Sequence, residues 1–442
     1  MRRFNRRESR RRRHAARRWA TVVALVLAHV GWAAPAVAQE GLRADLGPRE
    51  RALAEAVVRT SPELAALRAE LEAARARADA AGFAAPPVLS GEVEEVPGGY
   101  DFAGAAFRVE VGREFLVGGR GGAARALAAA GVAAAEIAVA AAERRLGALA
   151  FRELSRAAAG TRAARRLAAE DSLLLGAEGA VRDRFSVSEA RYVDVLRLRT
   201  ERLRVQTERA DALADARAAR EALTGLAGPE GATGVIALLG SLLATVPDPA
   251  EDTPLPPLPS PEALLEISGE LRLADVAVER ARTARALVLA EQRPRLSASL
   301  GAQRIVEDGD NRFGPVLGAS MTLPFGARRG NQAAALAAER EVRAAEATRA
   351  AVIARVRADV AGAMVRYEAA RERLAVYDAA LIRGAREERE SALAAYRTGE
   401  MTLIELLDFE RALARAEIDG LRARADAAEA YANLISSVEG GR

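Results

Sequence analysis

The sequence predicts a mainly α-helical exported protein with a small β part, arranged as two structural repeats. Three observations lead to this fold class. The same order of segments occurs twice, each copy contains a helix-forming stretch of about 60 residues, and two short segments of alternating polarity precede each stretch. A period near 200 residues is far longer than the roughly 20–50 residues of a solenoid repeat. The chain is therefore a duplicated half, which suits an object built around an axis.

The two copies keep their register along the chain. Ser61-Pro62-Glu63-Leu64 recurs 207 residues later as Ser268-Gly269-Glu270-Leu271. Gly118 corresponds to Gly326, 208 residues on. Farther along, Phe185-Ser186-Val187-Ser188-Glu189 pairs with Tyr396-Arg397-Thr398-Gly399-Glu400.

Residues 1–38 have the form of a secretory signal peptide. Residues 1–18 hold ten arginines and one glutamate, residues 19–32 are largely apolar, and Ala36-Val37-Ala38 is a small-residue cleavage site. The apolar run of about 14 residues is shorter than the roughly 20 that a membrane-spanning helix needs, although a retained anchor stays the alternative. No cysteine follows the site, so a lipid anchor on an N-terminal cysteine is excluded.

The composition of residues 39–442 excludes several classes of function. The leader carries ten of the 65 basic and one of the 61 acidic residues, which leaves 55 against 60, so the remainder has a net charge of −5 and no nucleic-acid footprint. Both histidines, His14 and His29, lie in the leader, the chain has no cysteine, and every basic residue is arginine. Nucleophilic Cys–His pairs, Schiff-base lysines and His or Cys metal sites are therefore excluded, and we expect no enzyme, no metal site and no cofactor.

The long stretches have the period of helices. Residues 331–395 contain no proline and only two glycines, Gly362 and Gly384, while apolar side chains recur at threes, fours and sevens. About 65 residues at 1.5 Å each give a rod of roughly 95 Å. Residues 122–182 repeat the feature, and second helices are expected over 192–223 and 403–437. Apart from the leader, we expect no stretch apolar enough for a transmembrane helix.

The alternating segments have the period of strands. Residues 107–115 alternate strictly between apolar and polar, residues 296–301 do the same, and residues 88–96 and 316–323 are weaker versions. Turn-rich loops at 97–101 and 307–311 join the pairs. Strands of about ten residues with unlike faces fit a transmembrane barrel or an ordinary soluble hairpin. If they cross a membrane, four strands per chain cannot close a barrel, so several chains must combine them.

A proline-rich connector separates the copies. Seven prolines fall within residues 247–261, which predicts an extended segment, and Ser260-Pro261-Glu262 then starts a helix with an N-cap and a proline at its first position. We therefore divide the chain into a signal peptide (1–38), a first repeat (39–245), a linker (246–261) and a second repeat (262–442).

With these features, the sequence resembles the outer-membrane efflux protein family typified by TolC. The most specific points are the strand-to-helix junctions at 115–121 and 323–332, and the stretch from Tyr396 to Asp408, which is similar to the family's Y-x-x-G-x-x-x-x-x-[DE]-[VL]-L-[DE] pattern. The second junction, with Leu323-Pro324-Phe325 and Arg329-Gly330-Asn331-Gln332, is more similar to the heavy-metal branch of the family.

The resemblance implies a homotrimer whose 12 strands form one outer-membrane β-barrel in lipid. Twelve helices continue that barrel as a long periplasmic α-helical barrel. It also implies a passive channel that conducts solutes to the cell exterior, with a periplasmic adaptor protein and an inner-membrane transporter as partners. Drugs, metal ions and secreted polypeptides all stay open as cargo, as do the pump type and the open or closed state of the tip.

The resemblance also assigns candidate roles to the turns between the long helices. Phe185, Ser188, Tyr396 and Gly399 lie in the two tips that would face the adaptor, although the aromatic residues could equally anchor the turns. Gly399 allows a tight turn, whereas Ser188 stands where a glycine is expected.

Just inside the tips, Glu405 and Asp408 occupy positions where the family has acidic residues that face the closed pore. Their i, i+3 spacing places them on one helical face, and three copies would form rings of negative charge. The first repeat has Asp194 and Arg197 there, so Asp194 alone repeats the acidic character. A solvated helix face is the alternative.

Two other classes of protein compete with a channel. A periplasmic adaptor would carry one helical hairpin between β-rich halves, rather than two full strand–strand–rod copies. A structural coiled-coil protein of the envelope would not need alternating strand pairs.

Overall fold

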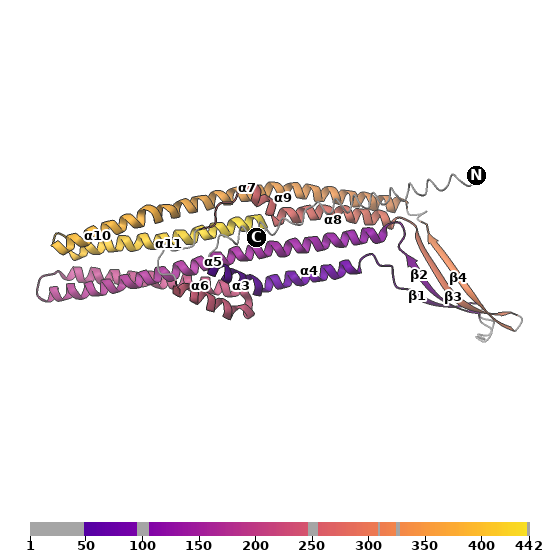
Figure 1. The fold of residues 1–442 in the computed structure, drawn as a ribbon, viewed down its shortest axis with the longest axis horizontal. Coiled ribbons are helices and arrows are strands. Elements are labelled where there is room, and N and C mark those ends of the chain that lie inside the picture. Colours follow the sequence, from indigo (N-terminus) through magenta and orange to yellow (C-terminus); the bar gives the residue numbers. More distant parts are fainter. Residues whose placement is uncertain (1–47, 95–105, 246–254, 308–309, 324–327, 440–442) are drawn as a thin grey trace.

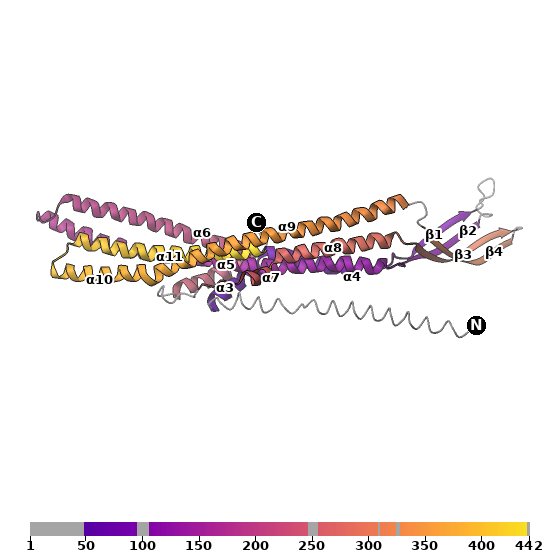
Figure 2. The ribbon, with the colours of Figure 1, turned by 90° about the horizontal axis from the view of Figure 1, so that it is seen from above.

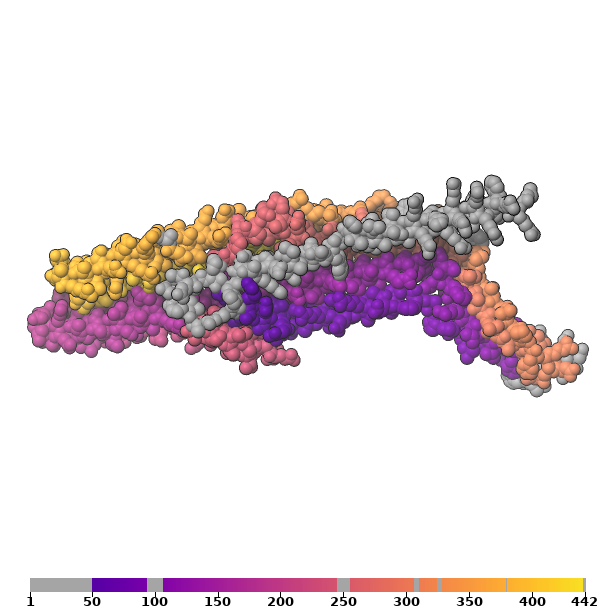
Figure 3. All heavy atoms as spheres, in the orientation of Figure 1, coloured from indigo at the N-terminus to yellow at the C-terminus, as the bar shows by residue number. Residues whose placement is uncertain are grey.

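The chain forms a long helical rod with a β-sheet at one end and two helix-hairpin tips at the other (Figure 1). This computed structural model describes residues 48–94, 106–245, 255–307, 310–323 and 328–439. The signal peptide, the loop 97–101, most of the proline-rich connector and residues 324–327 of the second junction lie outside the described residues. The space-filling view shows the sheet bending away from the rod axis (Figure 3).

Two segment series of matching order make up the rod. The first comprises α3 (Pro48–Thr60), α4 (Pro62–Ala80), β1 (Val88–Glu94), β2 (Ala106–Phe115), α5 (Arg120–Ser186) and α6 (Tyr192–Thr245). The second comprises α7 (Pro261–Ile267), α8 (Gly269–Glu291), β3 (Arg295–Glu307), β4 (Asp310–Thr322), α9 (Arg328–Val376), a π-helical turn η3 (Tyr377–Leu381), α10 (Ile382–Thr398) and α11 (Leu403–Glu439).

The four strands form one antiparallel sheet in the order β1-β2-β3-β4. The central pair joins the two series, with Phe115 opposite Leu296 and Phe107 opposite Arg304. The strands therefore meet in sequence order without a crossover. Glu307 pairs with Asp310, so the β3–β4 connection is tighter than the turn expected over 307–311.

Four helices lie side by side next to the sheet, in the order α4, α5, α8 and α9 (Figure 2). Matching ion pairs fasten the short helix of each series to its long one. Arg75 bonds Glu136 at 2.9 Å in the first series, and Arg282 bonds Glu346 at 2.8 Å in the second. The pairs Glu63–Arg145 and Glu270–Arg355 repeat likewise. The duplication thus extends to individual side-chain contacts.

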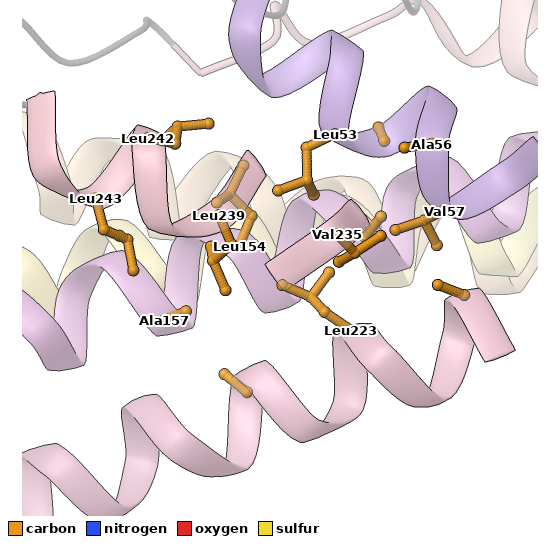
Figure 4. Packing of buried hydrophobic residues seen from close by; sticks show 14 residues of the cluster. Leu53, Ala56, Val57, Leu154, Ala157, Leu223, Val235, Leu239, Leu242 and Leu243 are labelled. Atoms are coloured by element: carbon orange, nitrogen blue, oxygen red, sulfur yellow. The ribbon is translucent and has the colours of Figure 1, made fainter. Parts of the chain in front are cut away.

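Three apolar clusters hold the rest of the rod together. In the middle, α3 and the C-terminal half of α6 pack on α5 through Leu53, Val57, Leu154, Leu223 and Leu239 (Figure 4). Beside them, Phe151, Tyr367 and Tyr431 join α5, α9 and α11, and the Tyr367 and Tyr431 rings lie 5.5 Å apart. Nearer the tips, side chains of α5, α6 and α11 form the third cluster, which includes Leu174, Val195 and Leu407.

A buried ion pair joins the two series at mid-rod. Arg144 of α5 bonds Glu439 at the end of α11, with Nη2 and Oε2 3.0 Å apart, and Glu439 also accepts the backbone N–H of Gly269 at the start of α8. In the first series the matching helix starts with Pro62, which has no N–H, and Gly228 packs against it where the second series has Glu439. The second series thus has the Glu439 carboxylate where α8 begins with a backbone N–H that can donate to it, and the first series has Gly228 instead, where α4 begins with proline.

Several sequence-based expectations need correction. The stretch expected to be one continuous helix over 331–395 is broken by η3, and the second helix of the first series runs on to Thr245 through a bend at Gly228 and Pro229. By length and composition alone, α5 and α6 each contain a stretch able to cross a membrane, so the expectation that none does was wrong. Alanine raises the hydropathy of both stretches, and a core helix of a soluble protein can reach the same length and hydropathy.

Candidate functional site

The sheet has one apolar and one polar face. Strand alternation and register place the following side chains together on the apolar face: Leu89, Val93, Phe107, Val109, Val111, Phe115, Leu296, Leu300, Phe313, Leu317 and Met321. Most of them are strongly exposed in the single chain, with Phe313 at 77% and Leu317 at 82%. An apolar surface of this extent on a soluble monomer would be unusual, which indicates that another apolar phase covers it.

Arginines flank the central part of the apolar face. Arg113 lies near the helical end of β2, and Arg304 lies at the far end of β3, where its guanidinium stacks 5.8 Å from the Phe107 ring and donates to Asn311 at 2.9 Å. Between residues 107 and 113, β2 spans roughly 20 Å at 3.4 Å per residue. That span is close to the roughly 25 Å apolar band of membrane barrels, with cations at its rims.

The opposite face carries serines, carboxylates and glycines. Arg108 lies 3.6 Å from Glu92 and 3.6 Å from Glu110, and it donates to Gln303 at 3.4 Å. Glu110 extends over the neighbouring strand at Gly301, where a side chain would collide with it and with the Val109 carbonyl. The polar face therefore suits water.

Both edges of the sheet are open. Among the described strands, β1 pairs only with β2, and β4 pairs only with β3. Each edge therefore presents a row of backbone groups able to pair with another strand.

At the opposite end of the rod, the two tips share one backbone geometry. Ser188 and Gly399, 211 residues apart, both adopt left-handed conformations, with φ of 64° and 83°. The Glu189 N–H donates to the Arg184 carbonyl at 2.8 Å, and the Glu400 N–H donates to the Ala395 carbonyl at 2.9 Å. Both turns are therefore Schellman caps, and Ser188 does not alter the turn that a glycine would make.

The side chains of the tips differ. In the first tip the rings of Phe185 and Tyr192 lie 5.5 Å apart, and Val187 and Val193 are 63% and 58% exposed. In the second tip, Tyr396 is half-buried and the exposed neighbours are Thr398, Gly399 and Glu400. The first tip thus presents an apolar surface, and the second tip presents a polar one.

Glu405 closes a capping box at the start of α11. Its Oε2 accepts from the backbone N–H and from the hydroxyl of Thr402, each at 2.8 Å, while the Glu405 N–H donates to Thr402 Oγ1 at 3.3 Å. The backbone and hydroxyl bonds from Thr402 lower the pKa of the Glu405 carboxyl. Asp194 instead accepts a side-chain hydrogen bond from Arg191 Nε at 3.3 Å, which is an i, i+3 ion pair. The pattern Thr-x-x-Glu was readable in the sequence and was missed there.

Asp408 belongs to an ionic group between the two hairpins. Its Oδ1 lies 2.8 Å from Arg411 Nη1 and 3.8 Å from Arg197 Nη2 of α6. Arg411 Nε also lies 3.0 Å from Glu201 Oε1 of α6, which makes a second ion pair. Burial raises the pKa of nearby Glu170, and the charges of Arg166 and Arg411 oppose that shift. The structure thus pairs Asp408 with Arg197, the residue that occupies the same position in the first repeat. The sequence held no signal for this contact.

In the described part of the chain, no group of three or more histidine, cysteine, aspartate or glutamate side chains has a geometry that could hold a metal ion.

Comparison with known proteins agrees with this architecture. Residues 261–439 match the family model of the outer membrane efflux protein. No curated protein sequence matches the chain. Among solved structures, the outer membrane protein VceC from Vibrio cholerae is 20% identical with a TM-score of 0.64, covering 88% of this chain and 95% of its own.

Two further solved structures share the fold. The Campylobacter jejuni CmeC outer membrane channel is 13% identical, with a TM-score of 0.66 and coverage of 89% of this chain and 86% of its own. The open state of the Neisseria gonorrhoeae MtrE outer membrane channel is 18% identical, with a TM-score of 0.63 and coverage of 88% and 89%. The resemblance to the outer membrane efflux protein family is thus confirmed, by sequence over the second repeat and by fold over nearly all of the described chain.

Proposed function

We propose that this protein is the outer-membrane channel component of a tripartite efflux system. The observation that carries the proposal is the two-faced sheet, which is apolar on one side, polar on the other and open at both edges, at the end of a long helical rod. An apolar face of this height fits lipid, and the polar face fits a water-filled lumen.

The two open edges of the sheet need partner strands from other chains, which a homotrimer supplies. Within hydrocarbon, an unpaired strand edge leaves backbone groups without partners, which costs several kcal/mol each. Pairing β4 of one copy with β1 of the next removes both edges, and three copies supply 12 strands. The helices α4 and α9 flank the same two sides of each chain, so the same ring would continue them as a helical barrel.

Transport in this arrangement is passive, because the chain only supplies a path from the periplasm to the exterior. The energy comes from an inner-membrane transporter, which reaches the tips through a periplasmic adaptor. The first tip, with exposed Val187, Tyr192 and Val193 beside Phe185, provides the apolar contact for the adaptor, while the Ser188 and Gly399 turns set the shape of the two tips.

Asp408, Glu405 and Asp194 form the charged constriction near the tips. Asp408 is the best supported residue of the constriction, since its side chain is 49% exposed to solvent although Arg411 and Arg197 lie beside it. Glu405 also caps α11, so its charge must be removed without removing the cap. Glutamine serves at that position of a capping box, which makes Glu405→Gln the matched variant.

The constriction is tested in planar bilayers. Asp408→Asn together with Glu405→Gln is expected to raise basal conductance and weaken block by divalent cations, and Asp194→Asn is expected to add to both effects. Conductance equal to that of the wild type in both the double and the triple variant would remove the constriction from the proposal.

The channel itself is tested on protein extracted from membranes. Detergent-purified protein is expected to sediment as a trimer, to resist dissociation in mild SDS without heating, and to conduct ions in bilayers. A freely soluble monomer that needs no detergent would overturn the proposal.

A further inference from the structure

One of the two long helices contains an extra residue, and the burial pattern shows where. Between α5 and α9, buried positions match at a spacing of 210 residues: Leu146 with Val356, Ala150 with Val360, Ala157 with Tyr367, and Ala164 with Leu374. All eight side chains are at most 7% exposed. The two helices therefore present the same faces up to Leu374.

Beyond Leu374 the spacing changes to 211. Buried Val181 matches buried Ala392, whereas a spacing of 210 would match it with exposed Ser391. The left-handed turn residues Ser188 and Gly399 keep the spacing of 211. One residue has thus been added between Leu374 and Ala392, and the π turn η3 lies within that interval.

A π turn absorbs one residue without rotating the helix beyond it. An added residue in an unbroken α-helix would turn every later side chain by about 100°, since the helix has 3.6 residues per turn. The wider turn removes that rotation at the expense of regular i→i−4 hydrogen bonds, so it is a local weak point and a site of bending. Its first-series counterpart, within α5, is continuous helix.

The facing helix is shaped around this turn. A Cβ on Gly420 of α11 would meet Ile382 Cδ1 at 3.0 Å and Tyr377 Cβ at 3.6 Å, so η3 packs closely against a bare stretch of backbone. The first-series residue 211 positions earlier is Arg209, so this glycine is not part of the shared pattern.

Within one chain, the helix beyond the turn contacts few other elements. Among the described elements, α10 packs extensively only on η3 and α11. Its cross-helix ion pairs, Arg386–Glu417 and Arg389–Glu410, also go to α11. The tip half of α5, in contrast, is packed between α6 and α11 through Leu174 and Val181.

From these observations we propose that the π turn Tyr377–Leu381 is a hinge about which α10 moves relative to the rest of the rod. Bending at η3 displaces the α10 side of the second tip, while the first tip and α11 stay fixed in the apolar cluster that they share. The role of this motion in a channel rests on the proposed function, whereas the hinge itself does not.

The test deletes Ala380 from the π turn, which should restore a regular helix with all faces in phase. Because the chain has no cysteine, nitroxide spin labels can be attached at Arg184→Cys in the first tip and Arg397→Cys in the second. Labelled chains are diluted with unlabelled ones so that each pair is measured within one chain. We expect a broad distance distribution for the parent protein and loss of the broad component after the deletion.

The matched control deletes Ala168, which lies in the stretch of α5 that corresponds to the π turn. No wide turn is available there, so this deletion rotates Leu174 and Val181 out of the core and is expected to abolish folding. If the Ala380 deletion is equally disruptive, η3 does not hold an added residue. If the Ala380 variant folds with an unchanged distance distribution, the hinge is refuted.

Channel measurements separate the hinge from the proposed function. In bilayers the Ala380 deletion is expected to lower the open probability. An unchanged open probability would contradict a role for the hinge in conduction. If the parent protein itself fails to conduct, the proposed function fails, and the distance distributions still decide whether η3 bends.

Discussion

At the scale of single residues, the two tip turns place different side chains in the same strained conformation. A non-glycine residue in the left-handed region costs roughly 1–2 kcal/mol, so Ser188 carries a cost that Gly399 avoids. The shared backbone hydrogen bonds show that the surrounding helices impose the turn in both cases.

A reciprocal exchange tests this difference. Ser188→Gly should stabilise the first tip by about 1 kcal/mol, and Gly399→Ser should destabilise the second by a similar amount. Hydrogen exchange at the Glu189 amide should slow roughly fivefold in the first variant, and exchange at the Glu400 amide should quicken roughly fivefold in the second. Equal exchange rates in parent and variants would mean that the turns carry no strain.

The capping box predicts a pH dependence confined to the second tip. Hydrogen bonds from Thr402 lower the folded-state pKa of Glu405, so their stabilisation is present above the ordinary carboxyl pKa and is lost as the pH falls through the lowered value. Protection of the Thr402 amide should fall over that acidic range. Glu405→Gln should show flat protection there, and a parallel fall in this variant would assign the effect to another group.

Contacts between individual residues were the part of the structure that the sequence predicted least well. The candidate residues Glu405, Asp408 and Asp194 could be named from the family resemblance, yet their partners could not. Arg197 and Glu201 are more than 200 residues from Asp408 and Arg411 in sequence. Only the packing of α6 and α11 beside α5 brings these charges together.

At the scale of elements, periodicity predicted the existence and type of nearly every strand and long helix. Alternation indicated the β2 strand almost to the residue, because both of its faces have a distinct environment. The π turn escaped prediction because η3 keeps the helical spacing of apolar residues on both sides. It becomes visible only when the burial of one repeat is compared with that of the other.

Glycines of the sheet allow a paired test of strand packing. Valine at Gly301 would collide with the Val109 carbonyl and the Glu110 side chain, whereas a Cβ at Gly91 meets no atom within 4 Å. Gly301→Val should therefore abolish recovery of heat-modifiable oligomer from membranes, and Gly91→Val should retain it. Similar recovery of both variants would argue against this sheet packing.

At the scale of the whole molecule, each end of the rod suits a different environment. The apolar face of the sheet fits lipid, the helical rod between carries mainly charged and alanine-rich surface, and the tips present one apolar and one polar turn. The sequence could predict this difference between the two ends of the rod because the same order of segments occurs twice. The sequence also predicted that several chains combine their strands, but it could not predict which residues of neighbouring chains pair, since those contacts are made between chains.

The central claim is that the apolar face of the sheet contacts lipid while the polar face lines water. Single cysteines at each position from Phe107 to Phe115, spin-labelled in vesicles, test it most directly, because oxygen concentrates in the bilayer and a nickel chelate stays in water. The account predicts a period of two, with Val109 and Val111 accessible to oxygen and Arg108, Glu110 and Gly112 accessible to nickel. Uniform accessibility to the nickel chelate along the strand would contradict it.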